Sequence, residues 1–282
     1  MNGPALVITA DDFGAAPAVN EAVEIAHRDG VLSAASLMVA GPAAADAVER
    51  ARRLPDLRVG LHLVLTDGRP VLPAEQVRRL TGRDGRFSDR MAAAGARMFF
   101  DPRARRELAA EIDAQFAAFA ATGLPLDHVN GHKHFQLHPT IARLIGEIGA
   151  RYGLRAMRVP VEPLASLALA DPAAPSRGDT VMSWWAKRSQ RAVRRSGLLT
   201  PDWVFGLRWS GAMTAPRLAG LIRVLPPGLT EIYLHPATHG EFEGAVADYL
   251  YAEELAALTA PGAAAAVAER GARLGGFADF AA

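Results

Sequence analysis

The chain has 282 residues, of which half are hydrophobic and 22% are charged, and its formal net charge is +1. This balance is typical of a globular protein with a large core and excludes a disordered chain, and the small net charge gives no sign of a nucleic-acid partner. The sequence has no cysteine, which excludes disulfides, thiolate nucleophiles and cysteine-ligated zinc, so any metal site must use His, Asp and Glu.

The N-terminal residues MNGPALVITADD lack the cationic start of a secretory signal and reach acidic residues early. No apolar run is long enough to suggest a transmembrane helix, which needs about eighteen residues or more. We therefore expect a cytoplasmic protein without a membrane span. Because α/β barrels commonly use this length for one domain, we also expect a single domain over residues 1–282.

Apolar runs and helical periodicities alternate along the chain. The expected strands are 5–9, 32–39, 57–65, 128–134, 156–161 and 230–234. The expected helices are 17–28, 43–53, 103–121, 139–152 and 216–225. An irregular insertion at about 66–102, rich in Gly, Arg and Asp, interrupts this pattern. Repeated βα units predict an α/β fold with a parallel sheet, either open or closed into a barrel.

Carboxylate and imidazole side chains follow the carboxyl ends of several expected strands. Asp11 and Asp12 come directly after the first strand, and His62 lies in the third. Because active sites of parallel α/β folds form at the carboxyl ends of strands, we expect these distant residues to converge. Two adjacent carboxylates either shift each other's pKa values or need a cation between them.

The fourth expected strand carries polar side chains at a spacing of two residues, which places them on one face of an extended chain. These residues are His128, Asn130, His132 and His134. A single buried histidine is usually a core residue with satisfied hydrogen bonds. Four polar side chains on one face favour a site, because each unsatisfied buried group costs about 1–3 kcal/mol. His235 follows the last expected strand, where a turn residue before Pro236 is the alternative interpretation.

Four motifs, TADDFG, GLHLVL, HVNGHKH and LHPA, occur in this order along nearly the whole chain. Together they resemble the YdjC/ChbG family of metal-dependent carbohydrate deacetylases. The resemblance implies a (β/α) barrel like that of polysaccharide deacetylases, with one divalent ion held by an aspartate and two histidines. Matched residue by residue, the ligands are Asp12, His62 and His132. Asp11 is then the general base, and His235 is the acid that protonates the amine leaving group.

The chemistry of these residues agrees with this allocation. Three protein ligands leave one position open, as in catalytic sites, and a divalent ion can polarise an amide carbonyl and lower the pKa of water toward about 7. The ion neutralises Asp12, while Asp11 stays near enough to accept a proton. Because adjacent side chains diverge in a strand, the backbone must turn at Phe13–Gly14, which glycine permits.

The chain departs from the family pattern at three positions. The family often has Asp, Ser and His where this chain has Asn130, Gly131 and Gln136. None of these is an expected ligand, but neighbouring groups orient ligating histidines and change metal affinity. The metal is therefore left open between Zn²⁺ and Mg²⁺.

A Trp/Arg-rich segment at about 182–213 contains all four tryptophans of the chain, interleaved with basic residues. This pattern suits a helix in a membrane interface, but a core-packed helix with a solvated basic face explains it equally, and RNA binding has no accompanying motif. The segment, with LLTPDWVFGLRWSGAMT, is similar to the hopanoid-biosynthesis-associated branch of the family (HpnK). That similarity implies N-acetylglucosaminyl-bacteriohopanetetrol as the substrate.

The expected function is thus a metal-dependent N-deacetylase of a lipid-linked amino sugar, acting in the cytoplasm or peripherally at the inner face of the membrane. Alternatives are a chitooligosaccharide deacetylase, a metal-dependent phosphoesterase, which often bridges two ions, and a non-catalytic sugar- or lipid-binding protein. We expect one ion per chain and no nucleic-acid partner. A homodimer is compatible with the sequence.

Overall fold

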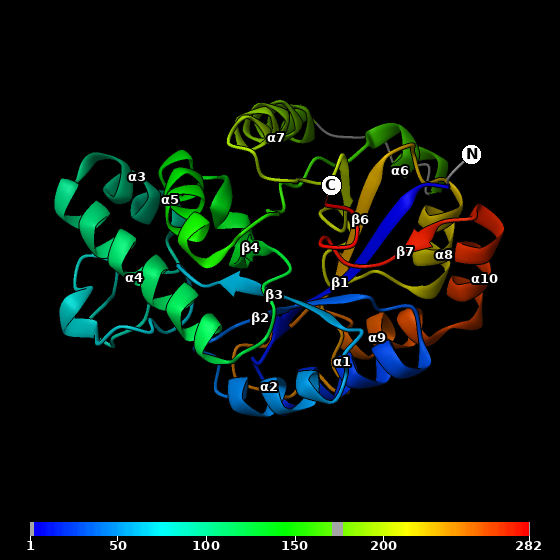
Figure 1. The fold of residues 1–282 in the computed structure, drawn as a ribbon, viewed down its shortest axis with the longest axis horizontal. Helices are drawn as coiled ribbons and strands as arrows, with labels where there is room; N and C mark the ends of the chain where they lie inside the picture. Colours follow the sequence, from blue (N-terminus) through cyan, green and yellow to red (C-terminus); the bar gives the residue numbers. More distant parts are fainter. Residues whose placement is uncertain (1–2, 171–176, 282) are drawn as a thin grey trace.

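A curled sheet of parallel strands forms the centre of the fold (Figure 1). The computed structural model describes residues 3–170 and 177–281. The sheet has seven strands in the order β4-β3-β2-β1-β6-β5, with β7 paired to β1. The strands are β1 (Ala5–Phe13), β2 (Ala34–Leu37), β3 (Arg58–Leu63), β4 (Val129–Gly131), β5 (Trp203–Phe205), β6 (Leu229–Leu234) and β7 (Arg273–Leu274). The expected α/β fold with a parallel sheet is confirmed.

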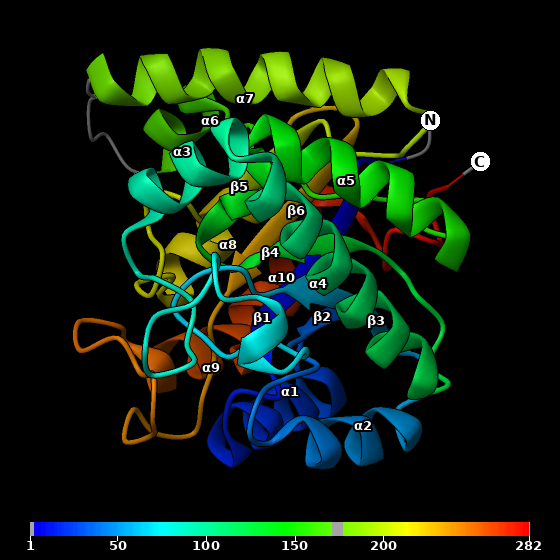
Figure 2. The same ribbon diagram turned by 90° about the vertical axis from the view of Figure 1, so that its left-hand side faces the viewer.

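Helices pack around the outside of this sheet. They are α1 (Pro17–Asp29), α2 (Ala44–Arg52), α3 (Met91–Phe100), α4 (Pro102–Ala121), α5 (Pro139–Gly149), α6 (Leu164–Ala170), α7 (Arg177–Arg195), α8 (Ala215–Arg223), α9 (Tyr251–Thr259) and α10 (Pro261–Arg270). Several begin with proline, whose fixed φ suits the first helical turn. Figure 2 shows α7 running along one edge of the molecule, and α7 contacts α5.

The central strands are apolar because both of their faces are covered. All six residues of β6 are buried, as are all but one of the nine in β1, and most of their side chains are apolar. The hydrophobic core lies between the sheet and the surrounding helices. None of the helices within the described residues has the length and apolarity needed to cross a bilayer.

The segment 155–161 bridges the two edges of the curled sheet. On one side Val129 of β4 donates its N–H to Ala156 O at 3.0 Å, and on the other Met157 donates to Leu199 O, just ahead of β5, at 2.9 Å. These are isolated bridges, so the strand expected at 156–161 does not form as a regular element. Through these bridges the curled sheet approaches the closed form of the expected barrel.

The insertion at 66–102 is more ordered than the sequence suggested. It contains a 3₁₀ turn, Ala74–Gln76, and the whole of α3. The residues of α3, MAAAGARMFF, carry no clear polar face, and only Gly95 and Met98 are buried, so the helical periodicity was weak. The next helix begins where the Asp101 carboxylate accepts from Arg103 N at 2.8 Å, a side-chain N-cap.

Candidate functional site

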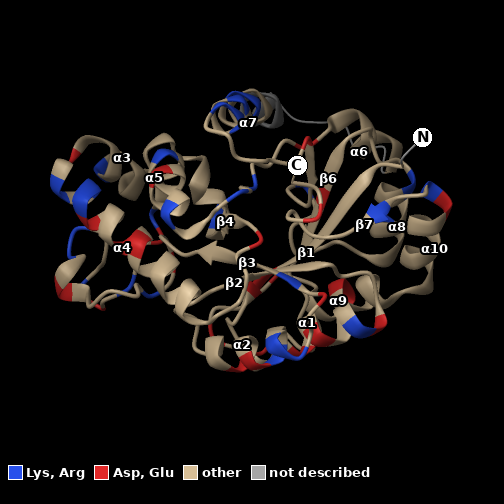
Figure 3. Cartoon of the chain, viewed as in Figure 1, with Lys and Arg blue, Asp and Glu red and all other residues tan. Residues whose placement is uncertain are grey.

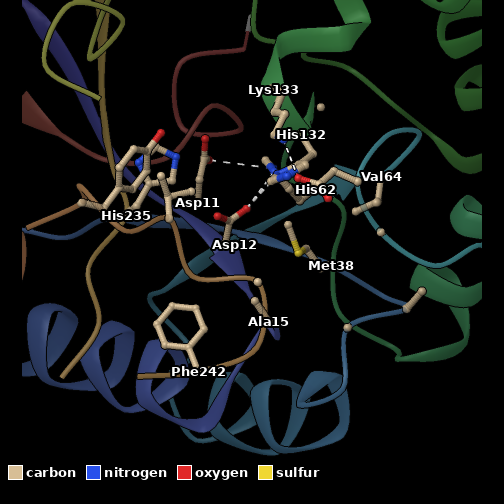
Figure 4. Close-up of a pocket in the computed structure, with 18 of the residues that line it drawn as sticks. Asp11, Asp12, Ala15, Met38, His62, Val64, His132, Lys133, His235 and Phe242 are labelled. Atoms are coloured by element: carbon tan, nitrogen blue, oxygen red, sulfur yellow. Dashed lines mark hydrogen bonds and ion pairs between the residues drawn. The ribbon is translucent and has the colours of Figure 1, made fainter. Parts of the chain in front are cut away.

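A cavity of about 370 Å³ opens at the carboxyl ends of the central strands (Figure 4). All five residues expected to form the site line it, and they come from four parts of the chain. They are Asp11 and Asp12 of β1, His62 of β3, His132 directly after β4, and His235 directly after β6. The expected convergence at this edge of the sheet is what the structure shows.

The two adjacent aspartates both reach the cavity because the end of β1 is irregular. The register between β1 and β2 shifts between Ala10 and Phe13, and Asp12 adopts a left-handed φ of 62°. This conformation is uncommon outside glycine but is tolerated best by Asp and Asn. The turn therefore begins at Asp12, one residue before the position expected from the sequence. Gly14, with φ of 94°, continues it.

Asp12, His62 and His132 form a compact cluster of ligand-type atoms. Asp12 Oδ1 lies 3.2 Å from His62 Nε2 and 3.2 Å from His132 Nδ1, and the three ligand atoms lie within 4.8 Å of one another. Neighbouring ligand atoms around a tetrahedral ion with bonds of about 2.0–2.1 Å lie about 3.3–3.4 Å apart. His62 Nε2 is also buried without a hydrogen-bond partner. The residues thus fit a single divalent ion.

The electrostatics of the cluster keep Asp12 ionised. Burial would raise the pKa of Asp12, but the facing imidazoles of His132 and His62 hold it well below its usual value. Burial likewise would lower the pKa of His62, and the carboxylates of Asp12 and Asp11 raise it instead. The cluster therefore favours positive charge beside the Asp12 carboxylate, which a divalent ion can supply in place of the imidazole proton.

The histidine cluster does not form one face of a strand, so that prediction was wrong. The strand β4 ends at Gly131, and a 3₁₀ segment, His132–Leu137, follows it. Lys133 and His134 both have left-handed φ values, of 53° and 55°, which breaks the alternation of side chains. As a result His132 faces Asp12, whereas His128 is fully buried elsewhere.

His134 has a different environment from that of the ligand-type histidines. Its Nε2 lies 2.9 Å from the Tyr233 hydroxyl. Burial and the nearby charge of Arg158 lower the pKa of His134 to about 3, so the ring is neutral. A neutral imidazole bonded to a phenol is a positioning contact at the cavity wall, and no ligand role follows from it.

Arg158 is a buried residue beside the site that the sequence did not lead us to expect. It is fully buried and pairs with Asp11, with Nη1 at 2.5 Å from Asp11 Oδ2, and with Glu231, with Nη2 at 2.7 Å from Oε1. Burial would raise the pKa of Asp11, but the guanidinium holds it far below its usual range. The sequence signal that could have identified it is the position of Arg158 in RAMRVP, where it is the one charged residue of the expected strand 156–161.

His235 belongs to an aromatic wall of the cavity. Its ring lies 5.7 Å from that of Tyr233 and 5.1 Å from that of Tyr249, and its backbone N–H donates to the Glu254 carboxylate. Figure 4 shows His235 and Phe242 on the side of the cavity away from His62. Successive ring contacts of 5.1–5.7 Å connect Phe242, Tyr251, Tyr249, His235, Tyr233 and His134.

Comparisons with known proteins agree with this fold and indicate the family of the chain. Residues 5–269 match the family described as YdjC-like protein. A carbohydrate deacetylase of Geobacillus stearothermophilus is 31% identical over 97% of both chains, and one of Homo sapiens is 33% identical over 95% of this chain and 88% of its own. In fold, the chain is similar to a candidate cellobiose-phosphate cleavage protein of Enterococcus faecalis, with a TM-score of 0.78, 24% identity, and coverage of 99% of this chain and 100% of that one. A family match over nearly all of the chain, with relatives that align from end to end, means that this protein belongs to the YdjC-like family.

Proposed function

We propose that the protein is a metal-dependent hydrolase that removes the N-acetyl group of an amino sugar. The observation that carries this proposal is the cluster of Asp12, His62 and His132 beside Asp11, at the carboxyl ends of the strands. The carbohydrate deacetylases that align over nearly the whole chain support the reaction class. A non-catalytic binding protein is disfavoured, because it has no need for four such residues around one cavity.

The donor set favours one ion of the Zn²⁺ type. Two imidazoles and one carboxylate suit zinc and similar transition ions, whereas Mg²⁺ prefers oxygen ligands. Within residues 3–170 and 177–281, this is the one cluster of three His, Asp or Glu side chains with such close ligand atoms. A single site also argues against a two-ion phosphoesterase. When bound, the ion supplies a Lewis acid that polarises the amide carbonyl and acidifies water.

The remaining chemistry falls to residues of the chain itself. Asp11 is held ionised by Arg158 and lines the cavity, so it can accept a proton from the attacking water. His235, on the opposite wall, is placed to give a proton to the departing amine. The aromatic wall that includes Phe242 and Tyr249 presents an apolar surface against which a sugar ring can pack.

The substrate we propose is a lipid-linked amino sugar, N-acetylglucosaminyl-bacteriohopanetetrol. Its support is the similarity of the Trp/Arg-rich segment to the hopanoid-associated branch. Incubation of the zinc-loaded protein with this glycolipid is expected to release acetate, and Asp11→Asn should lower the rate by about 10²- to 10⁴-fold, the usual contribution of acid–base catalysis.

Diacetylchitobiose and p-nitrophenyl phosphate serve as comparison substrates in the same assay. Acetate from diacetylchitobiose alone would keep the reaction class and change the substrate. Phosphate release without any acetate would instead favour the phosphoesterase. Circular dichroism of Asp11→Asn checks that the variant is folded, so that a lost rate reports on the carboxylate.

Peripheral membrane contact through α7 is the second part of the proposal. Three of the four tryptophans pack or bond within the protein and are not available to contact a membrane. Trp185 Nε1 donates to Leu137 O, Trp203 Nε1 donates to Pro227 O, and Trp209 is only 6% exposed. Core packing, the alternative interpretation of the segment, therefore holds for these three.

The outward face of α7 is nevertheless aromatic and basic. Trp184 is 64% exposed. The exposed cationic residues of the same helix are Lys187, Arg188, Arg191, Arg194 and Arg195. Figure 3 colours much of α7 blue, the colour of Lys and Arg. Arg194 is paired with Asp202 at 2.7 Å, which leaves the others as candidates for anionic headgroups. An exposed tryptophan beside cations suits a bilayer interface.

Vesicle sedimentation tests this surface. Each cation near an anionic membrane contributes about 1 kcal/mol, so Arg188→Glu/Arg191→Glu should lower the partition onto phosphatidylglycerol vesicles by about 30-fold or more. The matched control is Arg103→Glu/Arg106→Glu, which reverses two exposed cations on α4. Equal binding of wild type and α7 variant, or equal binding to neutral phosphatidylcholine vesicles, would remove the membrane proposal.

A further inference from the structure

A chain of buried hydrogen bonds leads from the metal-type cluster into the protein interior. His128 Nδ1 lies 2.8 Å from Asp127 Oδ2, and His128 Nε2 lies 3.0 Å from Ser36 Oγ. The side-chain amide of Asn130 donates to the same hydroxyl oxygen at 2.9 Å. All four residues are at most 4% exposed. None of them has a place in the reaction proposed above, so the reason for burying this polar chain must lie elsewhere.

The His128 ring is packed against Phe277 and Gly60 and is hydrogen-bonded at both nitrogens. Its centroid lies 4.6 Å from that of Phe277, and a Cβ on Gly60 would fall 2.5 Å from its ring atoms. Asp127, at the far end, accepts the backbone N–H groups of Phe277 at 3.1 Å and of Ala278 at 2.8 Å. The C-terminal segment thus fixes the carboxylate, and β3 leaves room for the ring only because residue 60 is glycine.

The direction of each hydrogen bond follows from the groups at its ends. Burial would raise the pKa of Asp127, but His128 and the two backbone N–H groups hold it below its usual value, so the carboxylate accepts. A neutral His128 ring then donates from Nδ1 and accepts at Nε2 from the Ser36 hydroxyl. The Ser36 oxygen can therefore only accept from Asn130, which places the Nδ2 end of that amide toward it.

The same amide orientation determines which nitrogen of His62 is protonated. Asn130 Nδ2 also donates to Asp11 Oδ1 at 2.9 Å, which leaves Asn130 Oδ1 facing His62 Nδ1 at 2.7 Å. Because an amide oxygen only accepts, a neutral His62 carries its proton on Nδ1 and presents the Nε2 lone pair toward Asp12. That nitrogen is buried and has no hydrogen-bond partner.

We propose that Asp127, His128 and Ser36 form a positioning chain for the metal site, which holds the Asn130 amide so that His62 offers Nε2 to the ion. Asn130 and Ser36 are positioning residues, since they act through His62 and contact neither the substrate nor the ion. This inference rests on the proposed metal centre. Its test therefore measures metal affinity and the His62 tautomer, neither of which depends on whether acetate is released.

Ser36→Ala and Asn130→Leu test the positioning chain. Removing groups that orient ligating histidines typically costs about 10- to 100-fold in metal affinity, so both variants should bind Zn²⁺ that much more weakly in calorimetric titrations of the metal-free protein. At a pH above the raised pKa of His62, where the ring is neutral, its ¹⁵N chemical shifts in the metal-free wild type should show one tautomer, protonated on Nδ1. In Asn130→Leu they should move toward a mixture of the two tautomers.

The matched control is Ser33→Ala. Ser33 is a buried serine whose hydroxyl accepts from Ile8 N and donates to Ile8 O, so its replacement also removes buried hydrogen bonds, neither of which involves Asn130. Its zinc affinity should equal that of the wild type. If Asn130→Leu does not fold, Ser36→Ala tests the proposal by itself, because this variant removes a single oxygen atom and is expected to fold. A folded Ser36→Ala protein with wild-type zinc affinity and an unchanged His62 tautomer would overturn the proposal.

Discussion

Replacing Asp12 with Asn is expected to prevent binding of the ion and to lower acetate release by about 10³-fold or more. The carboxylate is the one charged ligand of the cluster, and a Lewis acid contributes several kcal/mol to such a reaction, with about 1.4 kcal/mol for each factor of ten. Asn tolerates the left-handed φ of 62° at this position, so the fold should persist. Metal analysis and the acetate assay measure the two effects.

Asp12→Ala separates ligand loss from backbone strain. Alanine should lose the ion as asparagine does, but a left-handed alanine costs about 1–2 kcal/mol, which urea unfolding of the metal-free variants can measure. Wild-type protein treated with a chelator should behave like Asp12→Asn and regain activity with Zn²⁺ but not with Mg²⁺. Full activity of chelated, metal-free wild type would contradict the metal-dependent mechanism.

Arg158→Met is expected to destabilise the protein by about 3–5 kcal/mol. The guanidinium is fully buried between Asp11 and Glu231, so its removal leaves two buried carboxylates without their cation. Urea unfolding near neutral pH measures the loss. Arg143→Met is the matched control, because Arg143 forms an exposed pair with Glu147 and should cost at most about 1 kcal/mol.

The loss in Arg158→Met should depend on pH. In the wild type the folded-state pKa of Asp11 is lowered, so its contribution to stability is present above the unfolded value of 3.8 and is lost as the pH falls. Without Arg158, burial raises the pKa of Asp11, and protonation relieves the uncompensated charge. The difference in unfolding free energy between wild type and variant should therefore shrink as the pH is lowered toward about 4. A constant difference would contradict the assignment of this charge pair.

The local pattern of the sequence was sufficient to predict the alternation of strands and helices and the position of the site. Strands such as β1 and β3 are almost wholly buried, so the apolar runs in their sequences are visible without any tertiary information. Because side chains at the carboxyl ends of parallel strands converge, the meeting of Asp12, His62 and His132 followed from their places in the chain. The four motifs also indicated the family, which the comparisons confirmed.

Other features depended on contacts between distant segments. Arg158 faces Asp11 and Glu231 only because the segment 155–161 closes the curled sheet. Trp184 differs from Trp185 only in the direction that α7 gives each side chain.

The sequence by itself determined the alternation of strands and helices, the edge of the sheet that holds the site, and the family. Only the tertiary structure decided that Asp12 turns in the left-handed region and that His128 faces Ser36 while His132 faces Asp12. The physical reason is that hydrophobic periodicity reports on local conformation and burial. The partner of a polar side chain depends instead on the curvature of the sheet and on single backbone dihedrals. Neither of these produces a periodic pattern in the amino-acid sequence.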